Sequence, residues 1–323
     1  MIRRAVITGA TGAIGMALIG KCKESGTEAV VLVNPNSKRI ERIPDDPLVR
    51  IIKCGLKDFS AATPQTLGID ALEDGIFADA FFHLAWGGTF GDCRNDKALQ
   101  DRNAEYALDA VRLAARLGCS VFVGAGSQAE YGRVSGILRA DTACNPENEY
   151  GRAKLRASGE TRKLAHELGI RHIWPRILSV YGPYDGEKTM VMSLISTLLE
   201  GARPSLTKGE QVWDYLYADD AADAMMLMAE YGRDGAVYPL GSGTARPLCE
   251  YVKIIRDLID PKLELGFGEV PYSDRQVMHL CADISGLKQD TGFTQAFGFE
   301  EGAKRTIDYM KQIHRNKTED ADV

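Results

Sequence analysis

Hydrophobic and polar positions along the first half of the chain predict strands that alternate with helices. Short apolar runs bounded by turn residues are typical of buried strands, and longer runs with apolar residues at helical spacing are typical of amphipathic helices. The predicted strands span residues 4–8, 29–34, 49–53, 80–83, 120–123 and 171–175. The predicted helices include one that ends at Ser25 and two over residues 97–117 and 150–168. This alternation predicts an α/β protein with a doubly wound parallel (Rossmann) sheet.

The second half of the chain is less regular and predicts a smaller α/β lobe. Helical spacing predicts helices over residues 188–200, 219–230, 248–259 and 300–313. We therefore expect a dinucleotide-binding domain over residues 1–175. Residues 176–323 are expected to form mainly the outer lobe, with the chain crossing back to the first domain.

Composition narrows the possible partners and the compartment. A length of 323 residues fits one α/β domain with an added lobe. The net charge of -6, without a basic block, argues against nucleic acid or an anionic membrane as the main partner. Seven scattered cysteines without a CxxC pair predict reduced thiols in a cytoplasmic protein and no metal site. No apolar run reaches membrane-spanning length, and the first strand begins too early for a signal peptide.

A glycine-rich turn follows the first predicted strand and precedes the first predicted helix. A strand, a turn and a helix in this order are typical of a dinucleotide site, where glycines permit close approach and the helix N-terminus receives the pyrophosphate. Glycine triplets alone are weak evidence in a chain with 33 glycines, but this context strengthens the prediction. We expect the cofactor to contact Gly9, Thr11, Gly12, Ala13, Ile14 and Gly15.

The end of the second predicted strand bears on which cofactor is bound. A carboxylate at this position would accept hydrogen bonds from the 2′-hydroxyl of NAD, but Val33 and Asn34 occupy it. Ser37, Lys38 and Arg39 follow, and these groups can hold a 2′-phosphate. We therefore expect NAD(P) with NADP favoured, although a charged loop is more often a solvated surface.

Three further residues predict proton-transfer chemistry beside the cofactor. The fifth predicted strand leads to Ser127, and ligands of parallel sheets bind beyond the carboxyl ends of the strands. Tyr150 and Lys154 lie four residues apart in a predicted helix, so the ammonium group is expected near the phenol. A nearby cation favours the phenolate and lowers the pKa of a tyrosine from about 10. Tyr184 and Lys188 share this spacing, but the turn residues around them argue against a helix.

Two other residues each have two interpretations. Asp58 follows the third predicted strand, where it could meet the adenine amino group or act as an ordinary turn residue. The guanidinium of Arg275 suits a diphosphate, because it pairs bidentately with phosphate, but a surface salt bridge would also explain it.

Taken together, these motifs resemble the extended short-chain dehydrogenase/reductase family, which comprises NAD(P)-dependent nucleotide-sugar epimerases, dehydratases and ketoreductases. The resemblance covers nearly the whole chain, and residues 180–285 look most like CDP-abequose synthase-type 4-ketoreductases. The matching segments are TGATGAIG (8–15), HLAWGG (83–88), GSQAEYG (126–132), YGRAK (150–154), RILSVYGPYD (176–185), WDYLYADD (213–220), LGSG (240–243) and CADIS (281–285), together with Arg275.

The resemblance implies a role for each matching residue. Ser127 would be the catalytic serine and Tyr150 the acid/base, while Lys154 would bind the nicotinamide ribose and lower the pKa of the tyrosine. The C-terminal lobe would bind the nucleotide sugar, and helices that begin near Lys97 and Tyr150 would form a homodimer. Further cofactor contacts would be Leu84, Ala85, Trp86 and Asn103, and substrate contacts would be Ser179, Tyr215 and Arg275.

Departures from the family pattern narrow the expected reaction. Dehydratases carry an Asp-Glu pair directly after the catalytic hydroxyl, and here Gln128 and Ala129 occupy those positions, so dehydration is disfavoured. Trp213 occupies the place of a usual Arg, and Ser179 that of a usual Asn, so two substrate contacts differ from the pattern.

We therefore expect hydride transfer at C4 of a hexose carried on a nucleoside diphosphate, by either a 4-ketoreductase or a 4-epimerase. The alternative is a non-catalytic NAD(P)-binding sensor or partner-binding protein. Such a protein would keep the glycine-rich turn but would have no need for Ser127, Tyr150 and Lys154 together.

Overall fold

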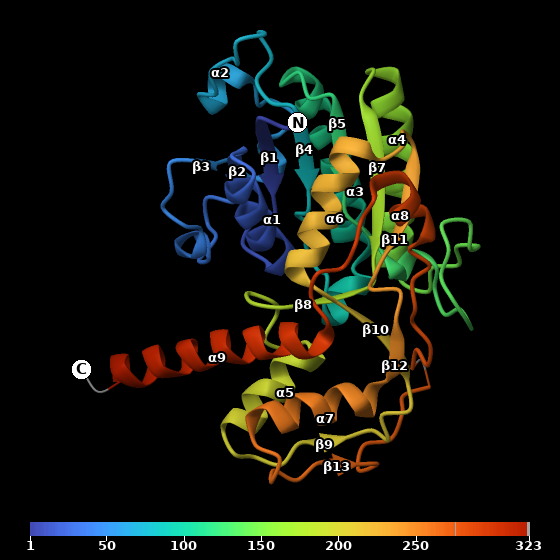
Figure 1. Cartoon of the computed structure of the whole chain (residues 1–323). Helices are drawn as coiled ribbons and strands as arrows, with labels where there is room; N and C mark the ends of the chain where they lie inside the picture. Colours follow the sequence, from blue (N-terminus) through green and yellow to red (C-terminus); the bar gives the residue numbers. More distant parts are fainter. Residues whose placement is uncertain (275, 322–323) are drawn as a thin grey trace.

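A parallel sheet with the strand order β3–β2–β1–β4–β5–β7–β11 forms the centre of the molecule, and the short β6 pairs with β7 (Figure 1). The computed structural model describes residues 1–274 and 276–321. The expected doubly wound Rossmann sheet is confirmed. The strands are β1 (Arg4–Thr8), β2 (Glu28–Val33), β3 (Val49–Lys53), β4 (Ala80–His83), β5 (Val121–Gly124), β6 (Gly126–Ser127), β7 (Arg171–Ile177) and β11 (Ala236–Leu240).

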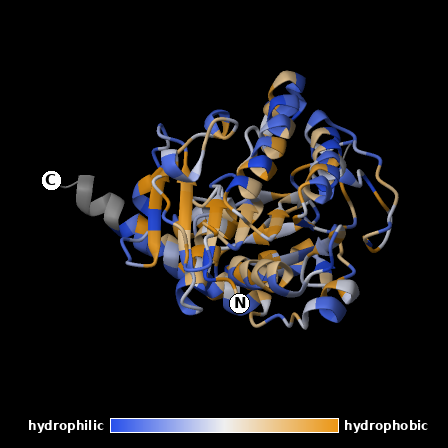
Figure 2. Cartoon of the chain, turned by 90° about the horizontal axis from the view of Figure 1, so that it is seen from above, coloured by the Kyte–Doolittle hydropathy of each residue, from blue (hydrophilic) through white to orange (hydrophobic). Residues whose placement is uncertain are grey.

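Helices cover both faces of this sheet because successive strand residues point to opposite sides. Val6 packs into the core beneath α3, and its neighbour Ile7 packs into the core beneath α1 and α6. The strands are accordingly hydrophobic, whereas the surrounding helices carry many hydrophilic residues (Figure 2). One face carries α1 (Ala13–Glu24), α6 (Ala218–Tyr231) and α8 (Ser285–Thr291), and the other carries α3 (Lys97–Arg116) and α4 (Glu149–Glu167). A short helix, α2 (Pro64–Leu67), follows β3.

The second half of the chain builds a smaller lobe with a core of its own, below the sheet in Figure 1. The chain returns from this lobe to the large sheet with α6 and β11. Its strands are β8 (Ser179–Tyr181), β10 (Val212–Tyr217) and β12 (Ala245–Pro247) in one sheet, and β9 (Ser205–Leu206) and β13 (Gly266–Phe267) in another. Its helices are α5 (Met190–Leu199), α7 (Leu248–Ile259) and α9 (Phe299–Ala321).

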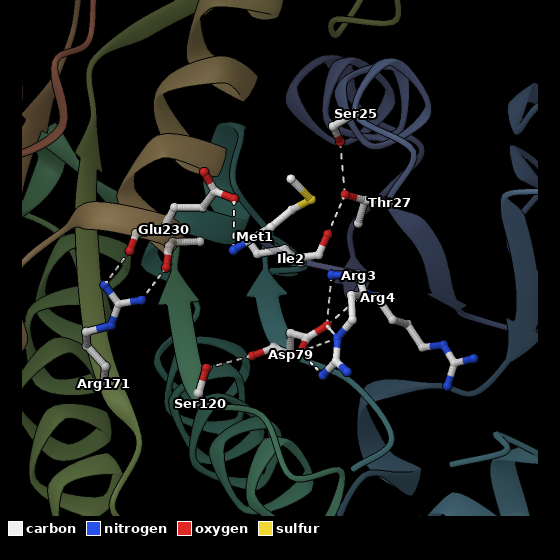
Figure 3. Close-up of polar contacts among 11 residues, drawn as sticks. Met1, Ile2, Arg3, Arg4, Ser25, Thr27, Asp79, Ser120, Arg171 and Glu230 are labelled. Carbon is white, nitrogen blue, oxygen red and sulfur yellow. Dashed lines mark hydrogen bonds and ion pairs between the residues drawn. The ribbon is translucent and has the colours of Figure 1, made fainter. Parts of the chain in front are cut away.

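Polar contacts fasten the edge of the large sheet at which its strands begin (Figure 3). The Asp79 carboxylate accepts hydrogen bonds from the backbone nitrogens of Arg3 and Arg4 at 2.8 and 3.0 Å. The Asp79 carbonyl accepts one from the Ser120 hydroxyl at 3.2 Å, and Arg171 donates to carbonyls at the end of α6. These ties join β1, β4 and β5 to one another and β7 to the end of α6, and they leave the opposite edge of the sheet for ligands.

All seven cysteines are free thiols. Within the two described stretches of chain, no helix has both the length and the hydropathy that crossing a bilayer requires. The long α9 continues beyond the predicted end at residue 313, to Ala321.

Candidate active site

The glycine-rich turn between β1 and α1 lies where the strand order reverses, because β1 stands between β2 and β4. Gly9 has a φ of +71°, and a Cβ there would come within 2.6 Å of the backbone nitrogen of Ala85. A Cβ at Gly15 would meet the carbonyl oxygen of Gly9 at 2.5 Å. Gly12 precedes α1 and supplies no side-chain cap, so the first N–H groups of α1 can receive an anion. The turn therefore fits a pyrophosphate.

A cleft of about 700 Å³ opens beside this turn, within the size range of ligand sites. The predicted residues that line it are Gly9, Thr11, Asn34, Ser37, Asp58, Ala85, Trp86 and Asn103. Those that adjoin it along the chain are Gly12, Ala13, Ile14, Gly15 and Leu84. Lys38 and Arg39 are exposed and are not among the described residues that line the cleft. The rest of the lining is partly apolar and was not predicted from the sequence; it includes Leu32, Phe59 and Tyr106.

Asn34 and Asp58 shape the turns at one end of this cleft. The side-chain oxygen of Asn34 accepts a hydrogen bond from the backbone nitrogen of Asn36 at 3.0 Å. Asp58 accepts one from the nitrogen of Gly55 at 3.1 Å. The turn role of Asp58 is therefore present, and its contact with adenine stays a prediction.

Ser127 lies in β6, just beyond the carboxyl end of β5. Its hydroxyl oxygen accepts a hydrogen bond from the nitrogen of Ala129 at 3.2 Å, and its own nitrogen donates to the Glu130 carboxylate at 2.8 Å. Gly126 is required here, because a Cβ would contact the ring of Trp174 and lie 2.8 Å from the Glu130 carboxylate. These reciprocal bonds fix the orientation of the serine.

Glu130 and Arg176 form a buried ion pair that the sequence analysis did not identify. The Glu130 side chain is 0% exposed, and it accepts hydrogen bonds from Arg176 Nε at 2.7 Å and from the indole of Trp174 at 3.0 Å. This network supports the turn that carries Ser127. The Ser-x-x-Glu spacing is a capping signal that can be recognised in the sequence. Arg176 lies 46 residues from Glu130, and no local sequence pattern indicates that the two residues pair.

Tyr150 reaches the same place from the first turn of α4. The helix begins after Asn148, whose side chain accepts a hydrogen bond from the nitrogen of Gly151 at 2.8 Å. Gly151 lets α4 approach the serine turn closely, because a Cβ there would contact the carbonyl of Ala129. Tyr150 is 8% exposed, and the Ser127 side chain lies close enough to influence its pKa. The phenol and the serine hydroxyl are therefore near neighbours.

Lys154 lies one helical turn further along α4 and is 3% exposed. Its ammonium nitrogen donates to the carbonyl of Ala125 at 2.6 Å and lies 3.6 Å from the centroid of the Trp86 ring. The same nitrogen is 5.9 Å from the centroid of the Tyr150 ring. The structure thus brings Ser127, Tyr150 and Lys154 together at the edge of the cofactor cleft.

Burial dominates the protonation of these groups. It raises the pKa of Tyr150, and the hydrogen bond with Ser127 and the charge of Arg94 act in the opposite direction. Burial lowers the pKa of Lys154 to about 7, against the attraction of Glu130. We expected Lys154 to lower the pKa of Tyr150, and the structure differs because the phenol is desolvated and the ammonium is bonded to a backbone carbonyl.

Asn103 and Gln100 of α3 hold the loop that lies over the cofactor cleft. Asn103 donates to the carbonyl of Gly87 at 2.9 Å and accepts from its nitrogen at 3.0 Å. Gln100, which the sequence analysis missed, accepts from the Trp86 indole at 2.8 Å and donates to the carbonyl of Cys93 at 2.9 Å. The predicted Asn103 therefore positions the backbone that carries Trp86.

The substrate residues predicted in the outer lobe do not all reach an open surface. The indole of Trp213 donates to the Ser179 hydroxyl at 2.8 Å, so the two departures from the family pattern bind each other. Tyr215 is 9% exposed and packs edge to face on Tyr251, in the aromatic core of the lobe. The predicted Arg275 lies outside the described residues.

Comparison with known proteins reveals relatives among enzymes of nucleotide sugars. The chain is 26% identical to the dTDP-glucose 4,6-dehydratase of Xanthomonas campestris pv. campestris over 184 residues, which are 54% of this chain and 52% of the relative. The chain thus spans about half the length of the curated relatives it matches.

Solved structures extend the likeness of fold to nearly the whole chain. The UDP-N-acetylglucosamine 4-epimerase from Methanobrevibacter ruminantium M1, in complex with UDP-N-acetylmuramic acid, is 21% identical with a TM-score of 0.84, over 96% of this chain and 99% of that one. The UDP-glucuronic acid 4-epimerase from Bacillus cereus, in complex with NAD, is 19% identical with a TM-score of 0.79 at the same coverage.

A protein-family model described as "NAD dependent epimerase/dehydratase family" matches residues 5–241. This span includes the glycine-rich turn, the Ser127 turn and the helix of Tyr150 and Lys154. Because the match takes in well over half of the sequence, the chain belongs to the NAD dependent epimerase/dehydratase family.

Proposed function

We propose that the protein exchanges a hydride at C4 of a hexose carried on a nucleoside diphosphate, as a 4-epimerase with NAD. One observation carries this proposal: Ser127, Tyr150 and Lys154 converge beside a cleft whose glycine-rich turn fits a pyrophosphate. A nucleotide-holding protein without chemistry would have no need to bury a lysine 3.6 Å from an aromatic ring centroid and to seat a phenol against a serine.

The protein's own groups handle the proton at the C4 oxygen. Tyr150 is the acid/base, which takes the proton from the C4 hydroxyl and returns it to the same oxygen. Ser127 holds that oxygen through its hydroxyl, which accepts a hydrogen bond from the nitrogen of Ala129, while Glu130 holds the Ser127 backbone. Lys154 binds the nicotinamide ribose and adds positive charge near the phenol as it becomes protonated. Bound NAD supplies the acceptor and donor of the C4 hydride.

The cofactor in this proposal is NAD, and the residues of the cleft would hold it. Gly9, Gly12 and Gly15 admit the pyrophosphate to the start of α1, and Asn103 keeps the loop with Trp86 over the cleft. The preference for NADP finds no support, because similar structures contain NAD and Lys38 and Arg39 do not line the described cleft.

Dehydration is not part of the proposed reaction, although dehydratases are among the curated relatives. Gln128 and Ala129 supply no acid or base where dehydratases have Asp and Glu. The carboxylate of Glu130 is committed to Arg176 and Trp174 and is buried away from solvent. Among the described residues that directly follow Ser127, none therefore offers a free carboxylate to remove water from C5 and C6.

Epimerase and ketoreductase use the same residues and differ in how the cofactor is kept. The structural relatives include several 4-epimerases, and the likeness of residues 180–285 to CDP-abequose synthase-type ketoreductases finds no support in these comparisons. This favours the epimerase, in which the bound 4-keto sugar rotates in the site and the hydride returns to the opposite face of C4.

Purified protein tests the proposal directly. Denaturation should release about one NAD per chain, and the native protein should interconvert C4 epimers of a nucleotide sugar without added cofactor. Turnover that requires added NADPH and a 4-keto sugar would assign it as a ketoreductase. Cofactor binding without turnover on a panel of UDP, dTDP, CDP and GDP sugars would favour the sensor.

Two further proposals concern the surroundings of the site. The outer lobe, residues 176–323, would bind the nucleotide sugar, with Ser179 and Trp213 at its edge. The chain would form a homodimer through α3 and α4, which pack on one another on the same face of the sheet. Sedimentation of the protein at several concentrations tests the dimer.

A further inference from the structure

A second cavity, of about 250 Å³, lies next to the catalytic residues, and its described lining is separate from that of the cofactor cleft. Gln128 and Ala129, which directly follow Ser127, line it. Asn148, which caps the helix of Tyr150, lines it as well. The cavity therefore adjoins Tyr150 from outside the cofactor cleft, and its size suits a sugar ring.

The side chains that line this cavity carry one more positive charge than negative charges. Its lining includes Arg94, Arg133 and Glu147. Arg133 pairs with Glu147 at 2.8 Å and is neutralised. Arg94 is half-buried, makes a long hydrogen bond of 3.4 Å to the carbonyl of Thr89, and has no acidic partner in the part of the chain that the structure describes. A guanidinium in this situation favours an anionic ligand.

The position of Arg94 restricts which anion it can meet. Its guanidinium carbon lies 4.6 Å from the centroid of the Tyr150 ring. If Tyr150 acts on the C4 oxygen, the diphosphate on C1 lies across the hexose ring from Arg94. The groups within reach are those on C3 and C5, the two neighbours of C4. A planar carboxylate on one of these carbons would match the paired N–H groups of a guanidinium.

We propose that Arg94 binds a carboxylate carried on C3 or C5, the two carbons next to C4, so that the substrate is an acidic nucleotide sugar. This inference rests on the proposed function and names its substrate class. Arg94 is then a specificity residue, and it reaches the substrate from the segment between β4 and α3.

Matched pairs of acidic and neutral sugars test this inference. UDP-glucuronic acid and UDP-glucose differ in a carboxylate on C5, and UDP-N-acetylmuramic acid and UDP-N-acetylglucosamine differ in one carried from C3. Glucuronic acid 1-phosphate and glucose 1-phosphate form a third pair, which differs in the same carboxylate but lacks the nucleoside. We expect the NAD-loaded protein to favour the acid of at least one pair by about 10-fold or more in kcat/KM or Kd.

Variants separate recognition from folding. Arg94→Gln should bring the acid-to-neutral ratio close to one, and Arg94→Lys should restore part of it. Arg112→Gln, a control that removes an exposed arginine paired with Asp109 on α3, should keep the wild-type ratio. Equal use of acid and neutral sugars by the wild type, or an unchanged ratio in Arg94→Gln, would overturn this inference alone. Turnover of no nucleotide sugar would overturn the proposed function, and this inference with it.

Discussion

Glu130→Gln tests how the catalytic serine is held in place. The Glu130 carboxylate accepts hydrogen bonds from the nitrogen of Ser127, the indole of Trp174 and Nε of Arg176. Glutamine has nearly the same shape, but its amide offers one oxygen and one NH₂ group. At least one of these donors would therefore face another donor, and the guanidinium would lose its counter-charge.

The expected loss follows from burial. The side chains of Glu130 and Arg176 are 0% and 7% exposed, and Nη1 of Arg176 is buried without a partner among the described residues. Removing one partner of such a pair leaves an uncompensated charge and costs about 3–5 kcal/mol. We expect Glu130→Gln to lose about this much free energy of unfolding and to lose kcat through a misplaced Ser127.

Urea denaturation and steady-state kinetics measure the two effects. Glu73→Gln, at an exposed turn position away from α3 and α4, should change stability by less than about 0.5 kcal/mol. Adding Arg176→Met to Glu130→Gln removes the unpaired charge, so the double variant should lose less than the sum of the single losses. A loss below about 1 kcal/mol in Glu130→Gln, the size of an exposed pair, or strict additivity would refute the reasoning.

Three other changes probe separate parts of the account. Burial lowers the pKa of Lys154 from 10.5 to about 7, so the unfolded chain binds one more proton between these values and stability should rise with pH there. Denaturation series from pH 7 to 10 should show this rise in the free energy of unfolding for the wild type but not for Lys154→Met. An equal rise in the wild type and the variant would contradict this prediction. Gly9→Ala should lose at least about 1–2 kcal/mol of stability and bind NAD weakly, because its φ is +71° and its Cβ would clash. At Gly12 a Cβ would come no closer than 3.9 Å to the carbonyl oxygen of Gly9, so Gly12→Ala should change stability by less than about 0.5 kcal/mol in the same denaturation assay. Trp213→Phe loses the bond to Ser179 and should raise KM for the nucleotide sugar while kcat changes little, which initial rates at saturating NAD measure.

Local patterns predicted the large sheet well. The predicted strand over 80–83 coincides with β4, because a buried parallel strand is a nearly continuous apolar run. The predicted strand over 49–53 coincides with β3, which lies at the edge of the sheet and is only partly buried. The strands of the outer lobe were not predicted. β10 reads VWDYLY and contains the buried Asp214, whose carboxylate accepts hydrogen bonds from Ser242, Gly243 and Ala282. Those partners are distant in sequence, so no local pattern marks this strand.

The candidate site was predictable where it depends on spacing and not where it depends on burial. Ser127 follows a strand end, and Tyr150 and Lys154 share a helix face, so three residues could be placed from the sequence. The direction in which the pKa of Tyr150 shifts could not be predicted from the sequence, because it depends on how deeply α4 packs against the serine turn. Arg94 and Arg176 were missed for the same reason, since their contacts join distant segments.

The central claim is that Tyr150 carries the proton in this reaction, and Tyr150→Phe tests it most directly. Tyr184→Phe is a matched control, because Tyr184 also precedes a lysine by four residues but lies in a turn with a φ of +66°. The account predicts that Tyr150→Phe lowers kcat/KM by about 10²–10⁴-fold with NAD affinity unchanged, while Tyr184→Phe keeps wild-type turnover. Turnover by Tyr150→Phe within a few-fold of wild type would contradict it.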